Sequence, residues 1–159
     1  IHVVEDGATF KENAIIKVLA LPDRPDVTYL AEDSGIEVAH LNGAPGIYSA
    51  RYAGEDASRE DMCTKLLKEC YGAGNRDAQY QAVMALRFPD GKIDTVSGIV
   101  KGHLAHEMTG DEGFGYDPVF KPADANCHAA ELEKSVKNAI SHRGKAIADL
   151  LEKLKQQAI

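Results

Sequence analysis

The stretch Gln79-Tyr80-Gln81-Ala82-Val83-Met84-Ala85-Leu86-Arg87-Phe88 decides the fold class of this chain. Every second residue from Tyr80 to Phe88 is apolar, which is the period of a strand that buries one face. Pro89-Asp90-Gly91-Lys92 is a turn sequence, and a second β-prone run follows at residues 93–104. The pattern therefore predicts an antiparallel β-hairpin over residues 79–104.

Helices are expected on both sides of this hairpin along the sequence. Residues 9–21 carry apolar side chains at helical spacing, and a proline follows that ends the helix. Residues 58–71 and residues 141–159 form two further amphipathic stretches, and each begins with a serine placed as an N-cap. With a short β-prone run at residues 27–31, these elements predict one domain of mixed helices and strands.

The composition is that of an ordinary globular domain. The chain has 159 residues, 44% hydrophobic and 27% charged, and a chain of this length buries roughly two-thirds of its unfolded surface. No run approaches the roughly 18 apolar residues of a membrane span, and the first residues lack the pattern of a secretion signal. We therefore expect a soluble, cytoplasmic protein with no membrane partner.

The charge balance argues against a nucleic-acid polymer as the partner. The net charge is −7, whereas binding to a phosphate backbone needs a field of positive charge. The three cysteines, Cys63, Cys70 and Cys127, form no CxxC pair. An odd number without that spacing indicates reduced thiols rather than a disulfide framework.

The acidic segment Glu32-Asp33-Ser34-Gly35 follows the short β-prone run. At the end of a strand, its carboxylates and hydroxyl would offer the oxygen ligands that a hard divalent cation needs. Glu5 would add another ligand if the fold brings it near. An Asx-type turn that closes the strand is the alternative, and the spacing alone leaves both interpretations open.

The segment Glu112-Gly113-Phe114-Gly115-Tyr116-Asp117-Pro118 interleaves glycines with aromatic rings and a carboxylate. Glycine lets a flat ligand approach the backbone and a ring closely. The alternative is a turn whose aromatic side chains fill the core.

A single basic cluster consists of Lys134, Lys137, Arg143 and Lys145, with no acidic residue between them. Ser141-His142-Arg143 opens the last predicted helix, whose free N–H groups and dipole favour an anion or a carbonyl oxygen. Arginine and histidine there are suited to donate hydrogen bonds to the edge of a base. A solvated, charged helix face is the alternative.

Other motifs give weaker evidence of a functional site. His103 and His106 form an HxxH at the end of a predicted strand, which lacks the facing of a helical zinc motif. The sequence has no glycine-rich loop ending in Gly-Lys-Ser or Gly-Lys-Thr and no GxSxG elbow. Arg51 either reaches a ligand or stabilises its own loop.

Five motifs occur in one order along the chain. They are Gly7-x-Thr9-Phe10-x-Glu12-Asn13-Ala14, Glu32-Asp33-Ser34-Gly35, the segment from Gly43 to Tyr52, Gly113-Phe114-Gly115-Tyr116-Asp117-Pro118 and Ser141-His142-Arg143-Gly144. In this order they closely resemble the inosine triphosphate pyrophosphatase family, the XTP/dITP diphosphatases. The resemblance implies hydrolysis of ITP, dITP and XTP to the monophosphate and pyrophosphate, with Mg²⁺, by a homodimer. It also implies a mixed α/β fold, with a twisted central sheet flanked by helices in two lobes and the nucleotide in the cleft between them.

The resemblance implies roles at the metal and the phosphates. Asp33 is similar to the family's general base and metal ligand, and Glu5 is similar to its partner at the metal. Ser34 is similar to a residue that contacts the substrate. Lys17 and Lys137 are similar to the lysines that hold the phosphates.

The resemblance also implies a pocket for the base. Phe114 is similar to the ring that stacks on the purine. The same pocket would be lined by Gly115, Tyr116 and Asp117. The 6-oxo edge of the base would be read by His142 and Arg143, which follow Ser141 at the start of the last helix.

The chain departs from the family at its start. The family begins with a strand and a helix that carry a phosphate-binding Thr/Ser-Gly-Asn-x-x-Lys loop, and this sequence starts after that point, so it is either a fragment of a longer protein or a shortened form. We therefore expect residues 1–159 to form a single, N-terminally truncated nucleoside triphosphate pyrophosphatase domain. Two alternatives stay open: a truncated subunit that binds purine nucleotides or a protein partner without turnover, and a phosphatase that removes the terminal phosphate.

Overall fold

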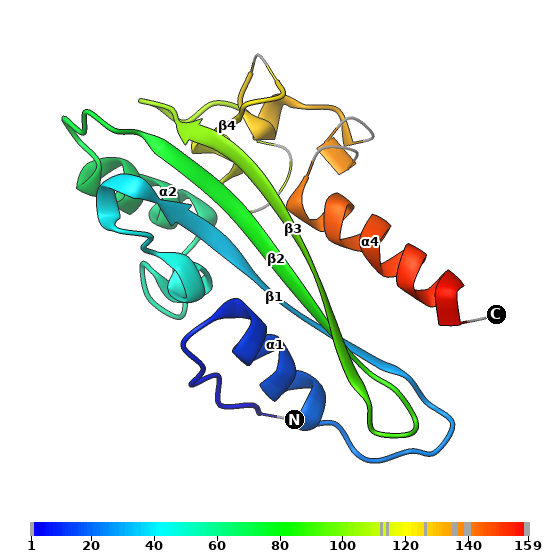
Figure 1. The fold of residues 1–159 in the computed structure, drawn as a ribbon. Helices are drawn as coiled ribbons and strands as arrows, with labels where there is room; N and C mark the ends of the chain where they lie inside the picture. The colour runs from blue at the N-terminus through cyan, green and yellow to red at the C-terminus, as the bar shows by residue number, and fades with distance from the viewer. Residues whose placement is uncertain are drawn as a thin grey trace.

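The computed structural model describes residues 2–111, 113, 115–125, 127–134, 137–138 and 141–157. Its centre is an antiparallel sheet of four strands in the order β1-β2-β3-β4. These are β1 (Tyr29–Val38), β2 (Asp77–Arg87), β3 (Ile93–Leu104) and β4 (Phe120–Pro122). Figure 1 shows the strands as a long twisted layer with helices beside it. The predicted α/β fold with a twisted sheet flanked by helices is confirmed, and its division into two lobes stays a prediction.

The predicted hairpin is confirmed as β2 and β3. The two strands pair from Asp77 opposite His103 to Arg87 opposite Ile93, and Phe88 N donates to Lys92 O across the turn at 2.9 Å. One feature differs from the prediction of a strand buried on one face only. From residue 82 to residue 87 every side chain of β2 is buried, because helices cover both faces of the sheet there.

The three predicted helices are present with the predicted caps. They are α1 (Phe10–Leu19), α2 (Arg59–Glu69) and α4 (His142–Gln157). Ser58 forms a capping box with Asp61, and Ser141 Oγ accepts from Gly144 N at 2.9 Å. Short 3-10 turns lie at Ala39–Leu41, Gly46–Arg51, Asp117–Val119 and Ala129–Glu131. None of the helices in the described part of the chain is both long enough and apolar enough to cross a membrane.

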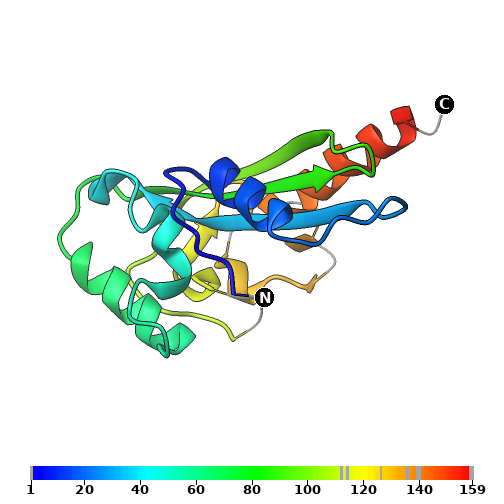
Figure 2. The ribbon, with the colours of Figure 1, turned by 90° about the horizontal axis from the view of Figure 1, so that it is seen from below.

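The helices lie on opposite faces of the sheet. On one face α1 packs against β1 and β2, with Phe10, Ala14 and Val18 against Val83 and Ala85. On the other face α4 packs along β2 and β3 through Ala146 and Leu150, and α2 packs further along the same face through Cys63, Leu66 and Cys70. Figure 2 shows the same arrangement from below. The sheet therefore separates two surfaces that carry different side chains.

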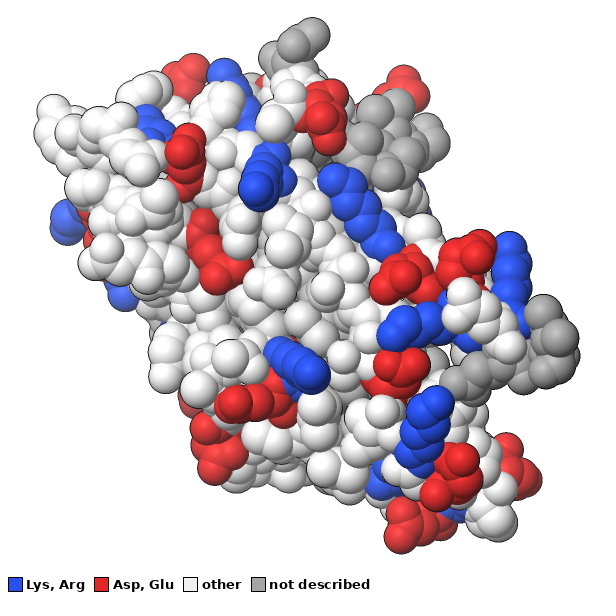
Figure 3. Space-filling view, viewed as in Figure 1, with Lys and Arg blue, Asp and Glu red and all other residues white. Residues whose placement is uncertain are grey.

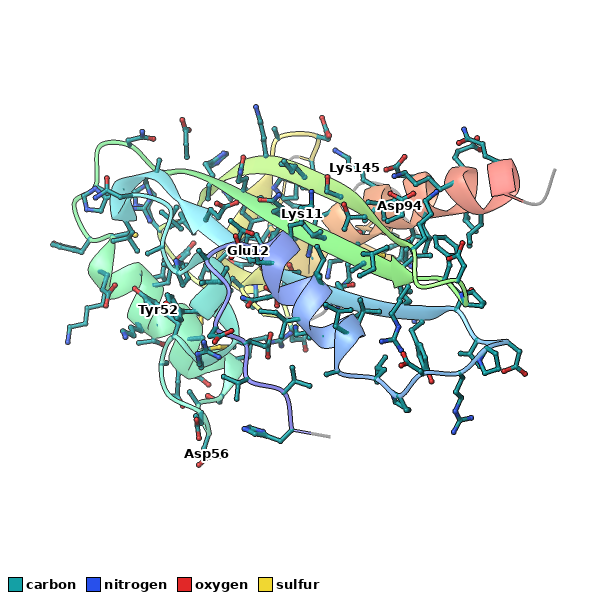
Figure 4. All side chains as sticks on the ribbon, turned by 60° about the horizontal axis from the view of Figure 1, so that its bottom comes forward. Lys11, Glu12, Tyr52, Asp56, Asp94 and Lys145 are labelled. Carbon is teal, nitrogen blue, oxygen red and sulfur yellow. The ribbon has the colours of Figure 1, made fainter. Side chains whose placement is uncertain are left out.

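Two lysines fix α4 to β3. Lys145 Nζ donates to Ile99 O at 3.2 Å, and Lys153 Nζ lies 2.9 Å from Asp94 Oδ1. Lys145 and Asp94 are labelled in Figure 4, where both lie beside the last helix. The start of α4, which carries Ser141, His142 and Arg143, is thereby held over the sheet.

The predicted end of the first strand is wrong. The sequence suggested a short strand at residues 27–31 that ends in the acidic segment, but β1 continues through it to Val38. Asp33 pairs with Val83 and Ser34 pairs with Ala82, in the interior of the ladder. Because neighbouring side chains of a strand point to opposite faces, the side chains of Glu32 and Asp33 lie on opposite faces of the sheet.

Gly98 on β3 lets the first turn of α4 approach the sheet. A Cβ at this position would overlap the carbonyl oxygen of His142 and lie 2.6 Å from Ala146 N. We therefore expect Gly98→Ala to push α4 away and to lower the free energy of unfolding by about 1–3 kcal/mol, the usual range for overpacking. Urea unfolding followed by circular dichroism measures the change.

Gly74→Ala is the matched control for this substitution. Gly74 lies in a loop with nothing within 4 Å of its virtual Cβ. We expect its free energy of unfolding to stay within about 0.5 kcal/mol of the parent value. Equal losses in the two variants would contradict the close approach of α4 at Gly98.

Candidate active site

Lys17 brings together the carboxylates that the sequence left apart. Its Nζ lies 2.7 Å from Glu5 Oε1 and 2.9 Å from Asp33 Oδ1, and it donates to Glu32 O at 2.9 Å. Lys17 reaches this position from the last turn of α1. The segment before α1, the helix itself and β1 therefore meet at one charged cluster, and we call Glu5, Lys17 and Asp33 the acidic cluster.

Asp33 has the properties of a chemically active carboxylate. It is 8% exposed, and Oδ2 is buried with no hydrogen-bond partner in the described part of the chain. Burial raises the pKa of Asp33, and the hydrogen bond from Lys17 opposes that shift without cancelling it. Burial alone would lower the pKa of Lys17, but its hydrogen bonds to Asp33 and Glu5 outweigh that effect and raise it.

The acidic cluster fits a small divalent cation together with a phosphate. Mg²⁺ is commonly held by one or two carboxylates, and water and substrate phosphates complete its octahedral shell. Asp33 Oδ2 has no hydrogen-bond partner among the residues that the structure describes, and Glu5 keeps 29% of its side chain exposed. No group of three or more His, Cys, Asp or Glu residues in the described ranges is arranged to hold a metal without such a substrate.

The opposite face of β1 carries a second ion pair. Glu32 Oε1 accepts from Arg143 Nε at 2.7 Å, which joins β1 to the first turn of α4. Ser34 lies half-buried on this face, two residues along the strand. The structure therefore separates Ser34 and Arg143 from the acidic cluster by the thickness of the sheet, although both were predicted to contact one substrate.

An aromatic group lies where α4 starts. The ring of His142 stacks on Tyr80, with centroids 4.7 Å apart and an interplanar angle of 10°, and Phe120 meets Tyr80 edge-on at 4.9 Å. The hydroxyl of Tyr80 accepts from Tyr116 N at 2.9 Å, and the Tyr116 hydroxyl donates to Ser49 O at 2.7 Å. Tyr80 thus connects β2, the loop before Tyr116 and α4.

A small cavity of about 20 Å³ lies beside this aromatic group. Four of the predicted substrate residues line it: Asp117, Lys137, Ser141 and His142. Asp117 is 1% exposed and forms an ion pair with Lys137. The structure therefore brings together residues from the glycine-aromatic loop and from the basic cluster, which are about 20 positions apart in the sequence.

An open basic groove adjoins the cavity. It is lined by Gly113, Leu132, Lys134, Lys137, Asn138, Ser141 and Arg143. Three of the four positive residues of the sequence cluster therefore line one groove, whereas Lys145 turns to β3. Figure 3 shows Lys and Arg side chains interspersed with Asp and Glu over the face of Figure 1, so charges of both signs are mixed on that face.

Several predictions can be placed individually. Phe114 lies outside the described residues. Gly115 has a φ of +57°, a conformation that favours glycine, and Tyr116 points into the core rather than into the cavity. Arg51 lies over the ring of Tyr48 at 5.3 Å, which supports its role within its own loop. All three cysteines are free, as expected.

Two contributors were missed by sequence reasoning. Tyr80 appeared only as one apolar member of an alternating strand, although its hydroxyl and ring contact both sides of the cavity. Arg59 carried no signal, because a charged residue in the first turn of a helix is usually solvated. The pairing of Glu32 with Arg143 also depends on contacts across more than a hundred residues.

His142 is held neutral by its position. It is 3% exposed, and burial, with Arg143 and Lys137 nearby, lowers its pKa to about 3. In the unfolded chain this histidine takes up a proton near pH 6.5, whereas in the folded chain it stays neutral until about pH 3. The free energy of unfolding therefore decreases as the pH is lowered from about 6.5 to 3. We expect this residue to remove about 2 kcal/mol of stability between pH 6.5 and pH 5.

Urea unfolding at pH 7 and pH 5 tests this expectation. The loss in the free energy of unfolding between pH 7 and pH 5 should be smaller in His142→Gln than in the parent chain, by about 2 kcal/mol. His40→Gln is the control, because His40 is exposed and its removal should leave the pH dependence unchanged. An equal pH dependence in the parent and in His142→Gln would mean that His142 is protonated in the folded chain.

Comparisons with known proteins show which family this chain resembles. The sequence profile of the Ham1 family matches residues 1–153. A dITP/XTP pyrophosphatase of Flavobacterium johnsoniae is 42% identical over 152 residues, which cover 96% of this chain and 79% of that protein. A dITP/XTP pyrophosphatase of Idiomarina loihiensis is 45% identical over 154 residues, covering 94% of this chain and 76% of that protein.

Solved structures show the same likeness. The Staphylococcus aureus Ham1 protein superposes with a TM-score of 0.94 at 43% identity, over 99% of this chain and 82% of that one. A HAM1 protein from Coxiella burnetii superposes with a TM-score of 0.92 at 38% identity, over 98% of this chain and 81% of that one. At these identities the likeness extends to the sequence as well as the fold.

Proposed function

This chain belongs to the Ham1 family, and from that premise we propose that it hydrolyses ITP, dITP and XTP to the monophosphate and pyrophosphate. Its relatives named as dITP/XTP pyrophosphatases support the substrate class. The structural observation that carries the proposal is the acidic cluster, in which a buried carboxylate oxygen of Asp33 is left for a ligand beside Glu5 and Lys17.

Asp33 acts as the general base in this proposal. Its raised pKa makes it a better proton acceptor than an ordinary carboxylate, which is the direction that general-base catalysis requires. It takes a proton from the attacking water, whose oxygen bonds to the α-phosphorus. The bond from the α-phosphorus to the oxygen that bridges to the β-phosphate breaks, and pyrophosphate leaves with that oxygen. Glu5 and Asp33 would hold Mg²⁺, which when bound neutralises the phosphate charge and supports attack on phosphorus.

The lysines bind the phosphates. Lys17 lies at the acidic cluster, and Lys137 lies at the cavity and at the basic groove. A triphosphate is strongly negative, and fixed ammonium groups stabilise it more in a partly buried site than in water. Ser34 and Arg143 lie on the other face of β1 from Asp33, so we assign them contacts with the nucleoside part.

The base is selected by hydrogen-bond donors at the start of α4. Ser141 and His142 line the cavity, and Ser141 also lines the basic groove, so a hydroxyl and an imidazole can donate there to a carbonyl oxygen. A 6-oxo purine offers an acceptor there, whereas adenine offers an amino group that leaves the donors unpaired. Asp117 also lines the cavity, Tyr116 fixes its loop from the core through the hydrogen bond to Ser49 O, and Phe114 would stack on the base.

The setting of the reaction is also part of the proposal. We expect a homodimer in the cytoplasm that acts on a small nucleotide, with no nucleic-acid polymer or membrane as partner. The net charge of −7 supports a small substrate over a polymer. Light scattering of the purified chain measures the oligomeric state.

Product analysis tests the proposed reaction. Purified chain is incubated with ITP or GTP, with Mg²⁺ or with EDTA, and the products are separated by ion-exchange chromatography. We expect IMP and pyrophosphate from ITP, much less release from GTP, and none with EDTA. IDP with orthophosphate would favour removal of the terminal phosphate, and ITP binding without any product would favour a non-catalytic subunit.

A further inference from the structure

Arg59 holds the backbone of a loop that is far away in the sequence. It is the first residue of α2, and its Nη1 donates to Gly113 O at 3.1 Å while its Nη2 donates to Asp111 O at 2.9 Å. A guanidinium presents its donors in a fixed planar fork, so it can fix the distance between two carbonyl groups. The ammonium group of a lysine has no such fixed planar arrangement of donors.

The described part of this loop needs external support. Gly113 and Gly115 have positive φ values of +78° and +57°, and glycine itself restrains the backbone least of all residues. Two further contacts come from other elements: Cys63 Sγ lies 3.7 Å from Gly115 O, and Tyr116 N donates to the Tyr80 hydroxyl. Arg59 and Cys63 therefore attach one side of the loop to α2, and Tyr80 attaches its end to β2.

The support behind Arg59 is rigid. Ser58 and Asp61 close a capping box at the start of α2, and Cys63, Leu66 and Cys70 are fully buried beneath the helix. A side chain that starts from a capped and buried helix is anchored by the contacts of that helix.

The loop in turn contacts the cavity. A Cβ on Gly113 would lie 2.6 Å from Lys137 Nζ and would overlap Asp117 Oδ2, so the Gly113 backbone packs directly on this ion pair. Movement of Gly113 would therefore move a wall of the cavity and the basic groove, both of which contain Lys137.

From these contacts we propose that Arg59 is a positioning residue, which holds the backbone at Asp111 and Gly113 beside the cavity and thereby sets the affinity for the nucleoside part of the substrate. The inference rests on the proposed function for the identity of the ligand. It concerns binding rather than the chemical step, because Arg59 donates to the backbone carbonyls of Gly113 and Asp111.

The test separates the nucleoside from the phosphates. Inosine and inorganic tripolyphosphate are used as competitive inhibitors of ITP hydrolysis, on Arg59→Ala, on Arg59→Lys and on the parent chain. In Arg59→Ala we expect KM for ITP and Ki for inosine to rise by about tenfold, the size expected for two lost charge-assisted hydrogen bonds at a partly exposed site. We expect kcat to stay within about twofold. Ki for tripolyphosphate should rise by clearly less than Ki for inosine, because Lys17 binds phosphates from the acidic cluster on the other face of the sheet. Arg59→Lys has one ammonium group in place of the guanidinium fork, so its KM for ITP and its Ki for inosine should lie between those of the parent chain and those of Arg59→Ala.

Lys68→Ala is the matched control on the same helix, because Lys68 is exposed on α2. It should change none of these constants. If Arg59→Ala weakens inosine and tripolyphosphate equally, its effect is a general structural one, and the proposal is overturned. Unchanged inosine binding in a folded Arg59→Ala chain overturns it as well.

Calorimetric titration with inosine separates this inference from the proposed reaction. If the parent chain binds inosine but releases no pyrophosphate, the proposed function fails, and a weaker affinity in Arg59→Ala would still support the positioning role. If the parent chain releases pyrophosphate and Arg59→Ala binds inosine with the same affinity as the parent chain, only the positioning role fails. A parent chain that binds no inosine overturns the positioning role.

Discussion

Asp33→Asn will lower the rate of pyrophosphate release from ITP by about 10²- to 10⁴-fold, the range that a general base contributes. An amide of the same shape cannot take the proton of the attacking water. It also removes one of the two carboxylates, Glu5 and Asp33, that Lys17 holds in the acidic cluster. Because the change keeps the size of the side chain, β1 should retain its pairing with β2.

Glu37→Gln is the control for this prediction. Glu37 lies on β1, four residues after Asp33 and on the same face of the strand, and its side chain accepts from Gln79 Nε2 at 3.1 Å. We expect its kcat to remain within about twofold of the parent value, because surface changes away from a site are usually small in effect. A loss of less than about tenfold in Asp33→Asn would remove Asp33 from the role of base.

Lys137→Met will produce the largest loss of stability. It removes the ammonium beside Asp117, whose side chain is 2% exposed, and leaves that carboxylate buried without this cation. Breaking a buried ion pair from one side commonly costs about 3–5 kcal/mol. We expect a value near the lower end, about 3 kcal/mol, because the Lys137 side chain keeps 14% exposure. Urea unfolding at pH 7 measures it.

A double-mutant cycle identifies the cause of this loss. Adding Asp117→Asn to Lys137→Met removes the buried charge and should recover at least about half of the lost stability, since contacting residues are coupled. Lys134→Met is the control, because Lys134 is exposed, and it should change stability by less than about 0.5 kcal/mol. Additive effects of the two substitutions would show that the pair contributes little.

The elements that could be predicted from the sequence are those set by local signals. The hairpin of β2 and β3 follows from alternation and from one turn sequence, and α2 follows from Ser58 with Asp61 three residues later. Each of these signals acts within a few residues, so no tertiary contact is needed to recognise it.

The end of β1 could not be predicted in this way. Glu32, Asp33 and Ser34 appear as a break in an apolar run, yet they lie inside the strand. The carboxylate of Asp33 forms an ion pair with Lys17 from α1 on one face, and that of Glu32 forms an ion pair with Arg143 from α4 on the other. Local propensity disfavours acidic residues in strands, and only distant partners make this placement stable.

The same limit applies to the site. The residue types of the acidic cluster, the glycine-aromatic loop and the basic cluster were recognisable, but their grouping was not. Glu5 meets Asp33 only because Lys17 bridges them, and Lys137 meets Asp117 only because the chain returns after β4. Arg59 shows the limit most clearly, since its two acceptors are backbone carbonyls, which no residue pattern marks.

The alternation of Glu32 and Asp33 across β1 also determines where this chain can change in length. One residue added to β1 ahead of Glu32 would turn the following side chains to the wrong faces, so Asp33 would point to α4 and Glu32 to α1. The turn at residues 89–92 lies at the far end of the hairpin from the loop that follows β3. Insertions, fusions and labels therefore belong in that turn, whereas β1 must keep its length.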